Sequence, residues 1–128
     1  MEVLQKFLEL KFKDVCKALF RVLLVGVSEY PDGGKWDTLD APPIDVLAMH
    51  KMFSKETIVK KKQIKKLIDA DNDKIIEELD GLSMAAEFAS SNDQQAVIIF
   101  YYSGHGITNR EDCLLYGIGN NGEFIPLE

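Results

Sequence analysis

The chain has 128 residues, of which 46% are hydrophobic and 28% are charged, and its formal net charge is −6. This length corresponds to one domain with a substantial core, and the acidic balance argues against nucleic acid or an anionic membrane as the main partner. Two cysteines, Cys16 and Cys113, are too few for a secreted disulfide scaffold and favour a reducing, cytoplasmic setting. No apolar run approaches the ~20 residues that cross a bilayer, and the N-terminus lacks the pattern of a secretory signal.

Residues 1–20 predict an amphipathic helix. Apolar residues from Leu4 to Leu19 recur at helical spacing, with Lys and Glu between them. Such a helix packs against a neighbouring domain element, ends an upstream segment, or binds a partner. The domain itself is expected to span residues 21–128.

The first strand is expected over residues 21–28, "RVLLVGVS", an apolar run rich in β-branched residues. Its lack of polar alternation is typical of a parallel strand that is buried on both faces. A long loop over residues 29–43 follows, and a loop of that length in a compact domain is commonly functional or disordered. A helix is predicted over residues 44–54, with Pro43 suited to its start.

The second half of the chain predicts a further strand, a helix, a third strand and a hairpin. The strands are expected over residues 63–68 and 95–104, and the helix between them over residues 71–90, with Asp71 in its capping group. Near the end, Asn120–Gly122 separates two apolar runs, which is a hairpin signal.

Alternating strands and helices predict an α/β fold with right-handed crossovers and a mostly parallel sheet. The simplest arrangement puts the first strand in the middle, so the crevice opens where the first and third strands end. Those ends are Ser28–Tyr30 and Ser103–Gly106. His105 lies there between two glycines, which let the backbone turn sharply and leave the imidazole unshielded.

Three segments carry a resemblance to a known family: "RVLLVGVSEY", "LDAPPIDVLAMHKMF" and "VIIFYYSGHG". Together they resemble the large-subunit region of caspase-like cysteine peptidases, over about residues 21–128. "YYSGHG" after an apolar strand is the most specific part, and it is closer to metacaspases and paracaspases than to animal caspases. The resemblance implies a three-layer sandwich of helices around the sheet and cysteine-type endopeptidase activity on a polypeptide substrate. Metacaspases often need calcium, but the extra aspartates of that site are not recognisable in this sequence, so no cofactor is expected.

The resemblance also implies roles for single residues. His105 would be the catalytic histidine, and the backbone N–H of Gly106 would donate to the oxyanion. Asp45 falls where members of this type carry the carboxylate of the primary specificity pocket, which implies cleavage after Arg or Lys. Tyr30, Ser28 and the loop over residues 31–41 would lie on the substrate side of the cleft.

One departure concerns the nucleophile. In the family the cysteine follows the histidine by ~50 residues, at the end of the next strand. Here Glu128 lies 23 residues after His105, and neither Cys16 nor Cys113 takes the expected place. We therefore expect this chain to carry half of a catalytic dyad, with a sheet incomplete on its C-terminal side. It would be inactive alone and completed by a small-subunit segment or a second chain. Self-association is a further expectation.

Several alternatives stay open on the sequence alone. The fold could serve as a catalytically dead scaffold or assembly module, or as a small ligand-binding α/β domain, although no Gly-rich phosphate loop follows the first strand. His105 could order a loop, Asp45 could be a carboxylate favoured by the helix dipole, and Ser28 or Cys113 could be a nucleophile.

Two charged segments have alternative readings as well. "DADNDKIIEELD" at residues 69–80 matches part of a calcium loop, but Lys74 stands where that loop needs glycine, so capping of a helix is the better interpretation. No metal site is expected. The lysine-rich segment over residues 55–66 is interpreted as a solvated face, with a phosphate or an acidic partner as the alternative.

Overall fold

The computed structural model of the protein describes residues 18–30, 36–109, 112–116 and 124–127. Its main body runs through β1 (Leu19–Gly26), α2 (Ala41–Glu56), a 3₁₀ turn η1 (Lys61–Gln63), β2 (Ile64–Ile68), α3 (Asn72–Ser91) and β3 (Ala96–Ser103). The chain continues through β4 (Gly106–Asn109), β5 (Asp112–Tyr116) and β6 (Phe124–Leu127). No helix in these ranges is long and apolar enough to cross a membrane.

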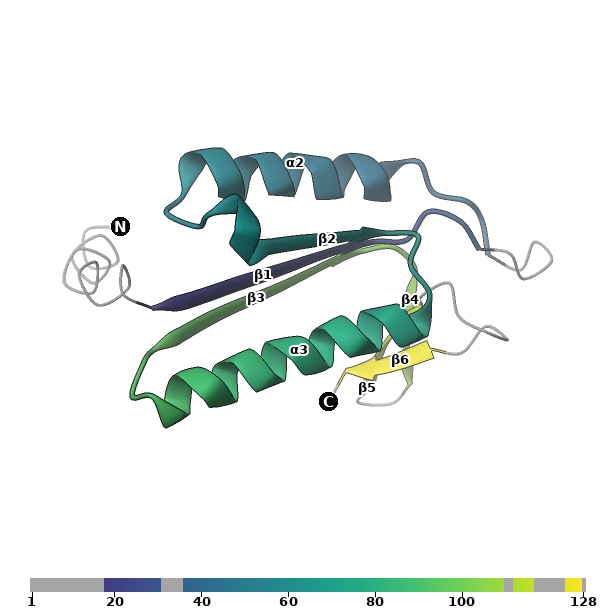
Figure 1. The fold of residues 1–128 in the computed structure, drawn as a ribbon. Helices are drawn as coiled ribbons and strands as arrows, with labels where there is room; N and C mark the ends of the chain where they lie inside the picture. Colours follow the sequence, from purple (N-terminus) through teal and green to yellow (C-terminus); the bar gives the residue numbers. More distant parts are fainter. Residues whose placement is uncertain (1–17, 31–35, 110–111, 117–123, 128) are drawn as a thin grey trace, which may run out of the picture.

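The main sheet has the order β2-β1-β3, and all its pairs are parallel. In register, Val22 of β1 lies between Ile64 of β2 and Ile99 of β3. The α2 helix covers one face of this sheet and the α3 helix covers the other (Figure 1). The predicted α/β class, the parallel sheet, the central first strand and the three layers are thus confirmed, with β3 at an edge of the sheet.

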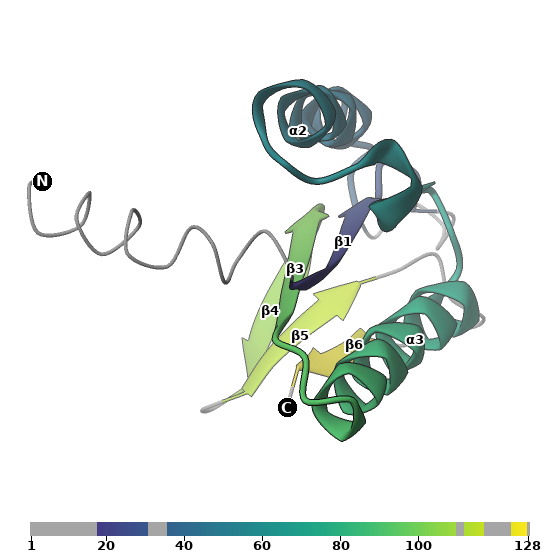
Figure 2. The ribbon, with the colours of Figure 1, turned by 60° about the vertical axis from the view of Figure 1, so that its left-hand side comes forward.

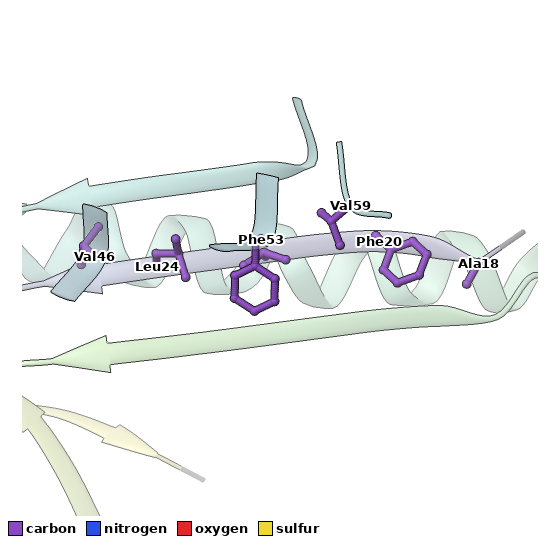
Figure 3. Packing of buried hydrophobic residues seen from close by; sticks show 7 residues of the cluster. Ala18, Phe20, Leu24, Val46, Phe53 and Val59 are labelled. Carbon is purple, nitrogen blue, oxygen red and sulfur yellow. The ribbon is translucent and has the colours of Figure 1, made fainter. Parts of the chain in front are cut away.

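Successive side chains of β1 point to opposite faces of the sheet and so divide the core into two halves. Val22 and Leu24 pack toward α2, where they meet Val46 and Phe53 (Figure 3). The intervening residues of β1 pack toward α3 with Ile75. A central strand buried on both faces needs apolar residues at successive positions, which explains the absence of alternation in its sequence.

The largest differences from the sequence-based boundaries concern β1 and α2, whereas β2, α3 and β3 differ by no more than a single residue at either end. β1 begins at Leu19, so the last two residues of the predicted 1–20 helix belong to the strand, and residues 1–17 of that prediction lie outside the described residues. α2 begins at Ala41, three residues earlier than expected. Pro42 and Pro43 occupy its first turn, where a missing N–H costs nothing and a fixed φ helps.

The third strand leads into a second, antiparallel sheet of order β4-β5-β6 (Figure 2). The β5–β6 pairing confirms the predicted hairpin, whose turn residues lie outside the described residues. The β4 strand, whose Gly106 pairs with Leu115 of β5, was not predicted from the sequence. Because this sheet is separate from the main one, it does not pair with the outer edge of β3.

Candidate active site

The site lies at the carboxyl edge of the main sheet, where the segments after β1, β2 and β3 come together. Two backbone bonds extend the sheet there: Val27 donates to the carbonyl of Ser103 at 2.9 Å, and Asp69 donates to that of Gly26 at 2.9 Å. The close packing of α2 on this end requires Gly26, since a Cβ would lie 2.8 Å from Cγ2 of Val46. The edge is therefore rigidly built.

The His105 imidazole is half-buried and directed by three neighbours. Its Nε2 lies 2.9 Å from the carbonyl oxygen of Asp37, and its ring lies 4.6 Å from the ring of Tyr30 and 5.1 Å from that of Trp36, between centroids. A carbonyl can only accept a hydrogen bond, so Nε2 carries the proton. The neutral ring then keeps a basic Nδ1, which no described residue engages.

The backbone of His105 is held as firmly as its ring. Its N–H donates to the Tyr30 hydroxyl at 2.7 Å, and its carbonyl accepts from the Tyr102 hydroxyl at 2.6 Å. The Tyr30 hydroxyl in turn donates to the carbonyl of Val27 at 2.9 Å. Burial raises the pKa of Tyr30 above its ordinary value, against the opposing effect of its hydrogen bonds with His105 and Tyr102. The phenol therefore stays protonated at neutral pH and keeps its donor.

Asp45 is brought to the end of β3. It lies in α2, and its Oδ2 accepts a hydrogen bond from the hydroxyl of Ser103 at 2.8 Å. Ser103 is two residues before His105, so the carboxylate and the imidazole share one edge of the sheet. The bond occupies one carboxylate oxygen of Asp45, which leaves acceptor capacity for a cationic group.

Ser28 and Tyr30 lie at the predicted edge but are almost fully buried, with 7% and 5% of their surface exposed. The Ser28 hydroxyl donates to the carbonyl of Leu39, and its N–H donates to Oδ1 of Asp69 at 2.7 Å. Little of either side chain is left for a substrate to touch. Their geometry favours support of the site over direct substrate contact, and it gives the Ser28 hydroxyl a partner other than His105.

Asp69 and Asp71 belong to the segment that matches part of a calcium loop, and both accept hydrogen bonds from backbone N–H groups. Asp71 caps α3 by accepting from the N–H of Lys74 at 2.8 Å, which confirms the predicted capping role. Asp69 accepts from the N–H groups of Ser28 and Glu29 at 2.7 and 3.1 Å. The described ranges contain no group of three or more metal-ligating side chains that could hold an ion.

Gly106 and Cys113 are placed by backbone register. Gly106 begins β4 directly after His105. Cys113 in β5 pairs with Thr108, three residues along β4 from His105, a distance of about 10 Å at the usual rise of a strand. Cys16 lies outside the described residues. The register thus puts the backbone of Cys113 opposite Thr108 and not opposite His105.

Sequence reasoning gave no individual role in this site to four contributors: Trp36 and Asp37, which lie in the loop expected to border the cleft, and Asp69 and Tyr102. Asp69 could have been found, because it directly follows a strand predicted to end at this edge. Tyr102 was visible in the "YYSGHG" motif but had no assigned partner. Trp36 and Asp37 act through a ring contact and a backbone carbonyl in a long loop, for which a sequence carries no signal.

The protein-family model of the caspase domain, peptidase C14, matches residues 20–128, which is most of the chain. The chain therefore belongs to the caspase domain family, and these residues form a caspase-like peptidase region. Searches of curated proteins and of solved structures found no match.

Proposed function

We propose that the chain is the large-subunit region of a cysteine-type endopeptidase, of metacaspase or paracaspase type, with His105 as its catalytic histidine. The observation that carries the proposal is the donation of Nε2 to the carbonyl of Asp37. This bond selects the tautomer in which Nδ1 is the basic nitrogen. A histidine fixed in one tautomer at the carboxyl edge of the sheet is suited to general acid–base chemistry.

The reaction would follow from that geometry. Nδ1 would take the proton of a cysteine thiol, the thiolate would attack the scissile carbonyl, and the imidazolium would then protonate the leaving amine. The N–H of Gly106 would donate to the oxyanion. The thiol would come from a small-subunit segment or a second chain, and the open outer edge of β3 is a surface on which such a segment could pair.

Specificity would come from Asp45. Its carboxylate lies near the end of β3 and is oriented by Ser103, and one of its oxygens is not used by that bond. A carboxylate in a substrate pocket favours Arg, which it can bind in a bidentate manner, or Lys, and it repels Asp. We therefore propose cleavage after basic residues.

A hydrolysis assay tests the proposal. The 128-residue chain, and a form that also contains the thiol-bearing segment, are given peptidyl amides that end in Arg, Lys or Asp. Only the thiol-bearing form should cleave, after Arg and Lys. His105→Ala should lower kcat/KM by about 10²–10⁴, the usual contribution of general acid–base catalysis. Asp45→Ala should lower it by about 10²-fold for Arg substrates, as expected for a lost charge-assisted pair.

His50→Ala is the matched control. His50 is the only other histidine, lies in α2, and has a pKa lowered by burial and by Lys66 and Lys61. This variant should retain full activity. Cleavage by the chain alone that is lost in Cys113→Ala would overturn the assignment of an external thiol. No cleavage by the thiol-bearing form would favour the scaffold role instead.

A further inference from the structure

Two tyrosine hydroxyls bind the two ends of the same residue, His105. The Tyr30 hydroxyl accepts from its N–H at 2.7 Å, and the Tyr102 hydroxyl donates to its carbonyl at 2.6 Å. Because the backbone N–H and the backbone carbonyl of His105 are both hydrogen-bonded, the φ and ψ angles of this residue are restrained. We call these two side chains the tyrosine pair.

The tyrosine pair is itself fixed by packing. Tyr30 belongs to the buried cluster on the α3 side of the sheet, and the partly buried Tyr102 packs against that same cluster. The Tyr30 hydroxyl is fixed a second time by its bond to the Val27 carbonyl at the end of β1. The hydroxyls therefore connect the position of His105 to the main core.

Gly104 completes this arrangement. A Cβ at this position would lie 2.7 Å from the Tyr102 hydroxyl oxygen and 2.8 Å from that of Tyr30, both closer than real Cβ contacts come. The backbone of Gly104 thus lies against both hydroxyls. This contact explains the glycine before the histidine in "YYSGHG", because a side chain there would displace the groups that hold His105.

The position of the His105 ring also depends on Tyr30. The Tyr30 ring meets the imidazole at an interplanar angle of 62°, while its hydroxyl binds the His105 N–H. One side chain therefore restrains both the backbone and the ring of His105, and the ring must stay in place for Nε2 to reach the Asp37 carbonyl.

We propose that Tyr30 is a positioning residue for His105, and that its hydroxyl, together with that of Tyr102, holds the imidazole in its Nε2–H form against Asp37. The catalytic meaning of this role rests on the proposed function. The positional role does not, because it concerns contacts within the chain alone.

The test compares Tyr30→Phe with Tyr101→Phe in the 128-residue chain by NMR. Tyr101 is the neighbouring tyrosine of β3, is half-buried on the opposite face of the sheet, and makes no hydrogen bond to another described residue. Each variant loses one hydroxyl. Tyr30→Phe should speed exchange of the His105 amide by about ten-fold, as for one lost hydrogen bond, and should turn its single imidazole tautomer into a mixture. Tyr101→Phe should change neither signal.

Unchanged His105 signals in Tyr30→Phe, or equal changes in both variants, would overturn the proposal. If Tyr30→Phe loses its overall fold, Tyr102→Phe replaces it, since it frees the other end of His105 and should also mix the tautomers. In the thiol-bearing form, Tyr30→Phe should lower kcat with little change in KM. The two proposals can fail separately. If Tyr30→Phe alters the tautomer but the wild-type thiol-bearing form is inactive, the proposed function is refuted and the positional role of Tyr30 is retained.

Discussion

Gly104 leaves no room for a side chain beside the two tyrosine hydroxyls. Gly104→Ala would place a methyl group on the hydroxyls of both Tyr30 and Tyr102, and the φ of +159° lies at the margin of the region that favours glycine. We expect a loss of about 1–3 kcal/mol in the free energy of unfolding, as for other overpacked positions. Denaturant titration measures this loss.

A double-mutant cycle tests whether the Tyr30 hydroxyl is the reason for the glycine at position 104. Tyr30→Phe removes one of the two clashing oxygens, so Gly104→Ala should cost less in that background than in the wild type. An equal cost in both backgrounds would show that the hydroxyl of Tyr30 is not the reason for the glycine.

Tyr30 should also make the free energy of unfolding decrease at alkaline pH. Burial raises its pKa in the folded state, whereas in the unfolded chain it titrates near 10. The folded state therefore prefers the protonated phenol, and the resulting stabilisation is complete below about pH 10 and is lost as the pH rises further. The free energy of unfolding should fall more steeply above pH 10 in the wild type than in Tyr30→Phe. Parallel curves would contradict this assignment.

Among the elements, β1 and β2 are connected not only by the hydrogen bonds of their parallel pairing but also by the side chain of Asp69, which follows β2. Its carboxylate accepts from the N–H groups of Ser28 and Glu29, and its own φ of 55° is left-handed, a region in which Asp and Asn are enriched. This connection fixes the segment that carries Tyr30. Three substitutions at this position separate its two contributions.

Asp69→Asn keeps an acceptor oxygen and the tolerance of a positive φ, so its stability should stay within about 1 kcal/mol of the wild type. Asp69→Gly keeps only the φ and should lose about 1–3 kcal/mol for two unpaired amides. Asp69→Ala loses both and should be the least stable. Thermal unfolding gives the ranking, and an Asp69→Gly variant as stable as the wild type would show that the carboxylate is not needed.

The outer edge of β3 predicts association. β3 is an edge strand of the main sheet, and all eight of its residues are partly exposed. An apolar strand with an unpaired edge invites addition of another strand. We expect species larger than one chain in sedimentation at micromolar concentration, and faster amide exchange in β3 than in β1.

Ile98→Lys in β3 should reduce this association by placing a charge on the strand. The same change at Ile76, which is 42% exposed on α3, is the control and should have no effect. A monomeric wild type with fully protected β3 amides would mean that another part of the 128 residues closes the edge.

For the molecule as a whole, the sequence predicted the layers well because the relevant signals are local and periodic. A β1 strand that is apolar at successive positions indicates burial on both faces, and Asp71 before the apolar stripe of α3 indicates its start. The position of His105 followed from topology alone, since parallel strands end at one edge.

The remainder of the site could not be predicted, for physical reasons. The contact between His105 and Asp37 uses a backbone carbonyl, which every residue has, so no side-chain pattern marks it. The bond between Asp45 and Ser103 joins residues 58 positions apart. The short β4 strand was missed because it has only four residues next to the glycine-rich turn.

The ring nitrogens of His105 provide the most direct test of the central claim, that the fold holds this histidine with its proton on Nε2 and with no described residue hydrogen-bonded to Nδ1. Nitrogen-15 NMR of the imidazole in the 128-residue chain needs neither a nucleophile nor a partner, and His50→Gln assigns the two histidines. In the neutral ring, a single tautomer with the proton on Nε2 is expected, because Nε2 donates to the carbonyl of Asp37. A proton on Nδ1, or an even mixture of tautomers, would contradict the claim.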